Sequence, residues 1–152
     1  MDEQVMSPAV SGAPRILLRL EGLTILAGCL CAFWFGPFHS LLGLAWPWVL
    51  LIFFTPDLSM LAYLAGPRIG AAAYNLAHTL AMPALVLTAG VVVIAMSLKG
   101  SASGLVHFME VATAVAVLWT AHIGFDRALG YGLKYASGFG HTHLGRIGRP
   151  KA

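Results

Sequence analysis

Four long apolar stretches dominate this sequence and decide what the chain can fold into. They cover residues 16–35, 37–54, 69–98 and 105–125, and a helix that spans a membrane needs about 20 such residues. Hydrophobic residues make up 59% of the 152-residue chain and charged residues only 10%, whereas soluble domains carry roughly 25% charged residues. The sequence therefore predicts an all-α, polytopic membrane four-helix bundle surrounded by membrane lipids.

The segments outside these stretches are short. Residues 1–15 are polar and lack the basic start and small-residue cleavage site of a signal peptide, so a disordered cytoplasmic tail is expected there. Residues 16–135 form the expected four-span membrane domain, whose last helix extends beyond Phe125 to about residue 134. Residues 136–152 are expected to be a second cytoplasmic tail.

Prolines mark the expected irregularities of the helices. Pro47 and Pro83 fall inside the second and third stretches, where a membrane helix tolerates proline as a kink because neighbouring groups take up the freed carbonyl. Between these stretches, residues 55–57 (Thr-Pro-Asp) are expected to stop the second helix. Asp57 is then expected to cap a short interfacial helix that runs to Leu64.

Basic residues are distributed very unevenly between the two ends of the predicted bundle. Lys99 alone falls on one side, while the other side holds eight: Arg15, Arg19, Arg68, Arg127, Lys134, Arg146, Arg149 and Lys151. Because cytoplasmic loops carry an excess of Lys and Arg, the N-terminus, the middle loop and the C-terminus are expected on the cytoplasmic side. No basic run indicates binding to nucleic acid.

Five ionisable side chains lie inside the apolar stretches or at their ends, where a charged group costs about 3 kcal/mol at the membrane centre. They are Glu21, Asp57, His78, His122 and Asp126. They come from four helices, yet all fall toward the predicted cytoplasmic end. His122 and Asp126 are four residues apart, so they share one helix face. We expect the five side chains to meet there.

Carboxylates and imidazoles in this number are the ligands expected for Zn²⁺, Mn²⁺ or Fe²⁺ held between helices. Such an ion would activate water or polarise a phosphoryl or carbonyl oxygen while a spare carboxylate takes the proton. The pattern predicts a metal-dependent hydrolase of a lipid-like or phosphorylated substrate. Asn75, Arg127, His141 and His143 could add contacts on the same side, although a solvated loop also explains the last two.

Two other classes of function explain the same residues. Buried acids and histidines also pair with each other and with arginines as interhelical hydrogen bonds, worth about 0.6 kcal/mol each on average. The chain would then be a non-catalytic accessory or scaffold protein for a partner membrane protein. A small carrier or proton relay is the third class, which the absence of an obvious internal repeat disfavours.

The chain also resembles a family of known sequences. The residues that carry the likeness are Leu20-Glu21-Gly22, Thr55 to Met60, Gly66-Pro67-Arg68, Tyr74 to Thr79, Ala121 to Arg127, Gly130 to Tyr135 and Thr142 to Gly148. They are similar to a bacterial family of small integral membrane proteins described only as a domain of unknown function, over about residues 15–149. This resemblance implies a bacterial inner-membrane protein and brings no established activity.

A more distant likeness concerns the order of the polar motifs. Pro56-Asp57-Leu58, His78-Thr79 and the His122-x-x-x-Asp126 pair resemble, in this order, motifs of bacterial membrane-bound metal-dependent hydrolases. That likeness implies that Asp57, His78, His122 and Asp126 are metal ligands and that Glu21 is a ligand or the base. The chain departs from the hydrolase pattern at Ser59, where a second aspartate usually stands, and it lacks a His-Arg pair. Because these departures remove residues of the hydrolase pattern, the likeness also fits a degenerate relative of these enzymes.

Overall fold

The computed structural model describes residues 9–97 and 103–147. Its helices and strands in chain order are α1 (Gly12–Phe35), α2 (Phe38–Leu42), α3 (Trp46–Phe54), the 3₁₀ helix η1 (Thr55–Ala65), α4 (Pro67–His78), α5 (Ala81–Ser97), α6 (Ser103–Leu129), β1 (His141–Thr142) and β2 (Gly145–Arg146). The first part of the predicted 1–15 tail lies outside the described residues, as do Lys99 and the last part of the 136–152 tail.

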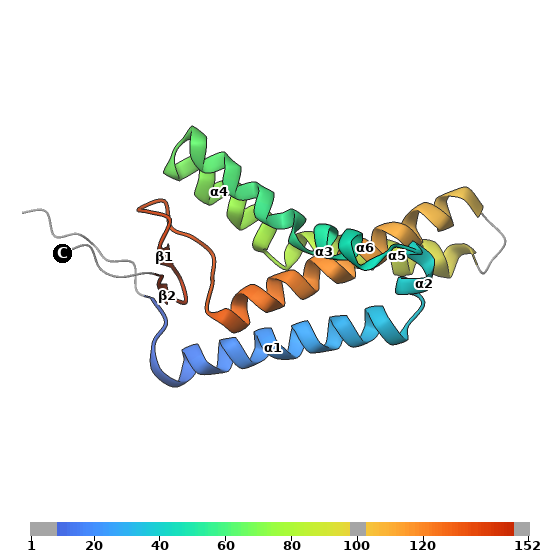
Figure 1. Ribbon diagram of the computed structural model, residues 1–152, viewed down its shortest axis with the longest axis horizontal. Helices are drawn as coiled ribbons and strands as arrows, with labels where there is room; N and C mark the ends of the chain where they lie inside the picture. Colours follow the sequence, from blue (N-terminus) through green and yellow to red (C-terminus); the bar gives the residue numbers. More distant parts are fainter. Residues whose placement is uncertain (1–8, 98–102, 148–152) are drawn as a thin grey trace, which may run out of the picture.

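Four helical units are long and apolar enough to cross a membrane, namely 12–35, 46–65, 67–97 and 104–129. The chain is therefore a multi-pass, all-α membrane protein, as its sequence predicts. The long helix α6 lies at the centre, and α1, α3 and α5 pack against it. Helices η1 and α4 lie side by side and project together at the upper left of Figure 1. The start of α1 and the β-hairpin lie at the same left-hand end, which we call the terminal end.

Two glycines set the close contact between α1 and α6. A Cβ atom on Gly124 would lie 2.7 Å from the backbone nitrogen of Leu26 and 2.8 Å from the carbonyl oxygen of Gly22. A Cβ atom on Gly22 would in turn lie 2.9 Å from the carbonyl oxygen of Gly124. Small residues of this kind let membrane helices approach until their backbones touch, so α1 is held tightly along the terminal half of α6.

The second span differs from its predicted bounds of 37–54. A separate short helix, α2, ends at Gly43, whose φ of 57° is the left-handed conformation that glycine adopts without strain. The span itself begins at Trp46, so Pro47 lies in the first helical turn and produces no kink, because no helical hydrogen bond is lost there. The predicted bounds were wrong because they merged α2 with the span.

The predicted stop at residues 55–57 is confirmed for the α-helix, since α3 ends at Phe54 with Thr55 as its C-cap, but the span continues beyond it. Helix η1 follows α3 without a break, and the two form one continuous 20-residue span, Trp46–Ala65. Asp57 lies in the first turn of η1, but its side chain makes no capping hydrogen bond. A helix is present where the short interfacial helix was predicted, but it is a 3₁₀ helix and it starts at Thr55. Pro56 is tolerated because it lies within the first turn of η1.

The third span is broken before its proline. Helix α4 ends at His78, Thr79 is extended (φ −83°, ψ 142°), and α5 begins at Ala81, so Pro83 lies in the first turn of α5. The carbonyl oxygen of Ala77, which an unbroken helix would bond to the amide of residue 81, instead accepts a hydrogen bond of 2.6 Å from the indole nitrogen of Trp119. The break leaves His78 at a helix end, free to face α6.

Helix α6 ends at Leu129 and does not extend to residue 134. Gly130 has a φ of 93°, and the amides of Gly130 and Tyr131 bond to the carbonyls of Arg127 and Asp126. This is a Schellman motif, which ends a helix at a left-handed glycine. The chain then turns into the β1–β2 hairpin, where Leu144 is fully buried. The amide of Val10 donates to the carbonyl of His143, which joins the two ends of the described chain.

Candidate metal centre

Four of the predicted side chains meet at the junction of η1, α4 and α6. They are Asp57 of η1, His78 at the end of α4, and His122 and Asp126 of α6. One ligand atom from each lies within 4.8 Å of all the others. His78, His122 and Asp126 are buried, whereas the Asp57 side chain is 32% exposed. The cluster is therefore a buried group of donors that opens toward the surroundings through Asp57.

Distances within the cluster resemble those between the ligands of a bound metal ion. The Nε2 atoms of His78 and His122 lie 3.2 Å apart. Asp57 Oδ1 lies 3.4 Å from the first and 3.5 Å from the second, and Asp126 Oδ2 lies 3.5 Å from His78 Nε2. Tetrahedral zinc with bonds of about 2.0–2.1 Å places neighbouring ligand atoms about 3.3 Å apart. The contacts around His78 therefore have the spacing that a small divalent ion requires.

Tyr74 orients two members of the cluster. Its backbone carbonyl is 2.9 Å from Nδ1 of His78, and because a carbonyl only accepts, that nitrogen carries the proton and leaves the Nε2 lone pair directed at the cluster. The Tyr74 ring stacks on the His78 imidazole with a centroid distance of 3.7 Å. Its hydroxyl donates a 2.7 Å hydrogen bond to Asp126 Oδ2. Metal ligands in proteins are usually held by such outer hydrogen bonds.

Two atoms of the cluster have no hydrogen-bond partner among the described residues. They are Oδ1 of Asp57 and Nδ1 of His122, both inaccessible to solvent. His122 itself is 0% exposed and packs against the rings of Phe53 and Phe54 at centroid distances of 5.3 and 5.9 Å. Buried polar atoms are almost always paired, so an unpaired carboxylate oxygen facing two imidazole nitrogens is the position that a cation would satisfy.

Glu21 is not brought into the cluster. Its side chain is exposed, and its carboxylate is not among the ligand atoms that converge. Four of the five predicted side chains therefore lie together, and Glu21 does not. The sequence could not resolve this, because the contact face of α1 is determined by Gly22 rather than by the polar residue.

The four additional residues have other surroundings. The side chain of Asn75 bonds the backbone of Lys134 twice, donating to its carbonyl (2.9 Å) and accepting from its amide (2.7 Å). Nδ1 of His143 accepts a 2.8 Å hydrogen bond from the amide of Leu133, and His141 contacts Ser137. Arg127 lines a small cavity beside the cluster. Asn75 and His143 therefore hold the segment after α6 in place.

Lys134 also lies near the cluster, which the sequence did not indicate. It is 5% exposed, its ammonium lies 4.5 Å from the centre of the Tyr74 ring and 3.6 Å from that of Phe139, and it donates to the Phe139 carbonyl (3.1 Å). Burial lowers the pKa of Lys134, and the nearby charges of Asp126 and Asp57 partly oppose this shift. A lysine just beyond the last span signals only a membrane interface in sequence.

This fold and this cluster define a multi-pass membrane protein with a buried Asp-His-His-Asp site. The chain belongs to the family described as Domain of unknown function (DUF4260), whose model matches residues 15–147. No curated protein and no solved structure matches the chain. The description of the family assigns no activity.

Proposed function

We propose that the cluster of Asp57, His78, His122 and Asp126 binds one divalent metal ion, Zn²⁺, Mn²⁺ or Fe²⁺, and that the chain is a metal-dependent membrane hydrolase or a degenerate relative of one. The observation that carries this proposal is the convergence of four ligand atoms within 4.8 Å. The mixed nitrogen and oxygen donors fit these three ions better than Mg²⁺ or Ca²⁺, which prefer oxygen alone.

Each ligand has a distinct part in the proposed site. A divalent ion held there supplies Lewis-acid polarisation of a carbonyl or phosphoryl oxygen and activation of water. Tyr74 keeps the Asp126 carboxylate and the His78 imidazole in fixed orientations. Asp57, the partly exposed member, lies where water and substrate enter, and its carboxylate is the group placed to accept a proton. Glu21 is given no part, because its carboxylate is not among the converging ligand atoms.

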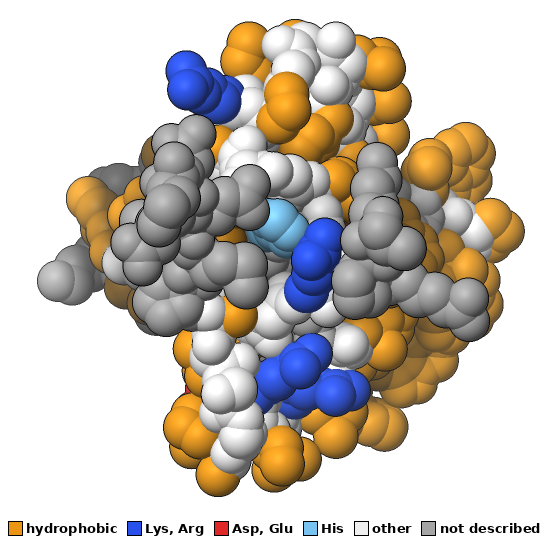
Figure 2. All heavy atoms as spheres, turned by 90° about the vertical axis from the view of Figure 1, so that its left-hand side faces the viewer, with side chains coloured by type: hydrophobic (Ala, Val, Ile, Leu, Met, Phe, Trp, Pro, Cys, Tyr) orange, Lys and Arg blue, Asp and Glu red, His pale blue; other side chains and the backbone are white. Residues whose placement is uncertain are grey.

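The substrate proposed for this site is lipid-like or phosphorylated. All four ligands lie within the candidate spans, and His122 and Asp126 lie in the last two turns of α6, which ends toward the terminal end. Figure 2 shows that terminal end, where basic side chains and a histidine lie at the surface. A basic surface attracts phosphate groups, which fits a phosphorylated head group.

The proposed location is a bacterial inner membrane with both termini in the cytoplasm. The support is the distribution of basic residues, eight of nine on the side of the termini. His122 and Asp126 lie in the last two turns of α6, on this side, so the proposed reaction takes place toward the cytoplasmic face.

One observation favours a metal-free alternative. The imidazoles of His78 and His122 are close enough to hydrogen-bond each other directly (3.2 Å), and Tyr74 bonds Asp126 without any ion. In this second candidate function the cluster fixes the packing of η1, α4 and α6 in a non-catalytic accessory or scaffold protein. It leaves Asp57 Oδ1 without a partner, and for this reason we rank it second.

Hydrolysis by the purified protein tests the proposal. Wild-type protein in mild detergent, stripped of metal and reloaded with Zn²⁺, Mn²⁺ or Fe²⁺, is assayed on nitrophenyl esters of phosphate, of a phosphodiester and of a fatty acid. Metal-dependent turnover of at least one ester is expected, with loss of at least tenfold in Asp126→Asn and none in Glu110→Gln, a half-exposed acid outside the cluster. A protein that holds the metal and hydrolyses none of the esters would overturn the hydrolase.

A further inference from the structure

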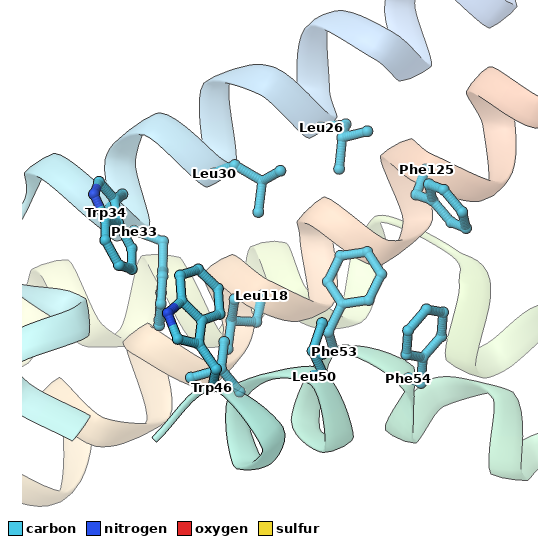
Figure 3. Close-up of a pocket in the computed structure, with 11 residues that line it drawn as sticks. Leu26, Leu30, Phe33, Trp34, Trp46, Leu50, Phe53, Phe54, Leu118 and Phe125 are labelled. Carbon is cyan, nitrogen blue, oxygen red and sulfur yellow. The ribbon is translucent and has the colours of Figure 1, made fainter. Parts of the chain in front are cut away.

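An apolar groove of about 480 Å³ lies between α1 and α3, with α6 as its floor. All eleven side chains that line it are hydrophobic. In Figure 3, Leu26 and Leu30 of α1 face Leu50 and Phe53 of α3 across this groove, and Leu118 of α6 lies between them. The groove forms because α1 and α3 both pack on α6 but diverge from each other. Its volume is typical of small-molecule sites, which measure roughly 300–1,000 Å³.

The groove is open to the lipid-facing surface of the bundle. Leu30, Trp34, Trp46, Leu50 and Phe54 line it and are still 43–57% exposed. They belong to the spans 12–35 and 46–65, so in a membrane their exposed sides face lipid and not water. A hydrocarbon chain can therefore enter sideways from the bilayer.

The two ends of the groove differ. At one end the rings of Trp34 and Trp46 stack with a centroid distance of 4.8 Å, and tryptophan is enriched at the edges of the bilayer. From Trp46 to Phe54 the helix rises about 12 Å, which is most of the roughly 15 Å that one leaflet contributes to a 30 Å hydrocarbon core. The groove therefore has the length and direction of an acyl chain in one leaflet.

The other end of the groove meets the metal centre. Phe53, Phe54 and Phe125 line this end, and the first two pack against the buried ring of His122. Phe54 directly precedes η1, and side chains three apart in a 3₁₀ helix lie in line, so Asp57 follows Phe54 along the same face. A chain lying in the groove thus has its end beside the cluster.

We infer that this groove binds the hydrocarbon chain of an acyl-chain lipid. The polar head group of that lipid lies at the Trp34 and Trp46 end, at the edge of the bilayer, and the end of its chain lies beside the cluster. This inference does not rest on the proposed function.

Photolabelling in vesicles tests the groove without relying on activity. The protein is reconstituted in phosphatidylcholine and phosphatidylglycerol vesicles that contain a phosphatidylglycerol with a diazirine on its acyl chain, and the labelled peptides are identified by mass spectrometry. Labelling is expected to concentrate on residues 26–34 and 46–54. The variant Leu30→Trp fills the groove and should reduce that labelling at least fivefold. Leu85→Trp, at a 65% exposed position outside the groove, should leave it unchanged.

Other results would overturn the inference. Labelling spread evenly over the exposed residues of α5 and the groove would mean that lipid contacts the surface only. Weak groove labelling in a dimeric protein would mean that a second copy of the chain fills the groove. Groove labelling that persists in His122→Ala, together with absent hydrolysis by the metal-loaded wild type, would uphold the lipid site and reject the hydrolase, so the two failures are distinguishable.

Discussion

The imidazoles of His78 and His122 face each other between α4 and α6, with their Nε2 atoms 3.2 Å apart. Because Nδ1 of His78 donates to the Tyr74 carbonyl, its Nε2 presents a lone pair. Without metal, a proton on His122 Nε2 faces that lone pair and, at 3.5 Å, Asp57 Oδ1, and in either case the buried Nδ1 of His122 is left as an unpaired acceptor. In the proposed metal-bound state, both Nε2 lone pairs and Asp57 Oδ1 would bind the ion.

Removing the hydroxyl of Tyr74 should weaken metal binding while the ligands remain. The variant Tyr74→Phe loses the 2.7 Å hydrogen bond to Asp126, and loss of such outer-shell bonds lowers metal affinity about 10–100-fold. Competition with a chromophoric zinc chelator measures the affinity. Tyr63→Phe is the matched control, because its buried hydroxyl has no hydrogen-bond partner among the described residues. Equal affinities for both variants would contradict the role of Tyr74.

The variant Gly124→Ala adds a methyl group that should force α1 away from α6. The new Cβ would lie 2.7 Å from a backbone nitrogen of α1, and because backbone cannot move aside cheaply, a loss of about 1–3 kcal/mol in the free energy of unfolding is expected. Thermal unfolding in detergent measures the loss. The control Gly28→Ala is on the facing helix α1, with nothing within 4 Å of the added atom. Equal loss in both variants would rule out the close contact.

Acid should destabilise the hairpin through His143. Burial lowers the pKa of His143 from its ordinary value of 6.5, and the nearby charge of Arg127 adds to this effect. The unfolded chain therefore binds a proton more readily, so this contribution to stability is complete above about pH 6.5 and is lost as the pH falls through the folded pKa. His143→Gln should flatten the decline in melting temperature between pH 7.5 and 5, and His141→Gln should not. An unchanged slope in His143→Gln would be evidence against this source of acid sensitivity.

The proposed orientation can be tested with single cysteines. After Cys29 and Cys31, the two cysteines of the chain, are replaced by alanine, Ser40→Cys and Ala136→Cys place one thiol at an exposed position at each end of the bundle. In intact bacterial cells, a membrane-impermeant maleimide should label Ser40→Cys and should leave Ala136→Cys unlabelled until the cells are broken. The reverse pattern would place the termini outside.

The sequence predicts the spans well because the signal for a membrane helix is composition over about 20 residues. The predicted helix boundaries are wrong where the backbone torsion of a single residue ends a helix. The left-handed Gly43 separates α2 from α3, and the extended Thr79 divides the third span. Neither torsion can be read from hydropathy, and the long 3₁₀ helix η1 is unusual for any sequence.

The candidate site was predictable in kind but not in detail. Polar residues in apolar helices identify Asp57, His78, His122 and Asp126 as residues that need partners. Whether a given residue faces the bundle depends on which side of its helix packs, and for Glu21 this is set by Gly22 against α6. The contacts made by the segment after α6, through Lys134 and His143, are set by tertiary packing and leave no periodic signal.

The most direct test of the account is the metal content of the purified protein. Wild-type protein, His122→Ala and His141→Ala are purified in mild detergent, offered Zn²⁺, Mn²⁺ or Fe²⁺, desalted and measured by inductively coupled plasma mass spectrometry. The account predicts about one ion per chain in the wild type and in His141→Ala, and almost none in His122→Ala. Absence of metal from the wild type, with a large loss of thermal stability in His122→Ala, would contradict it and support a metal-free packing role.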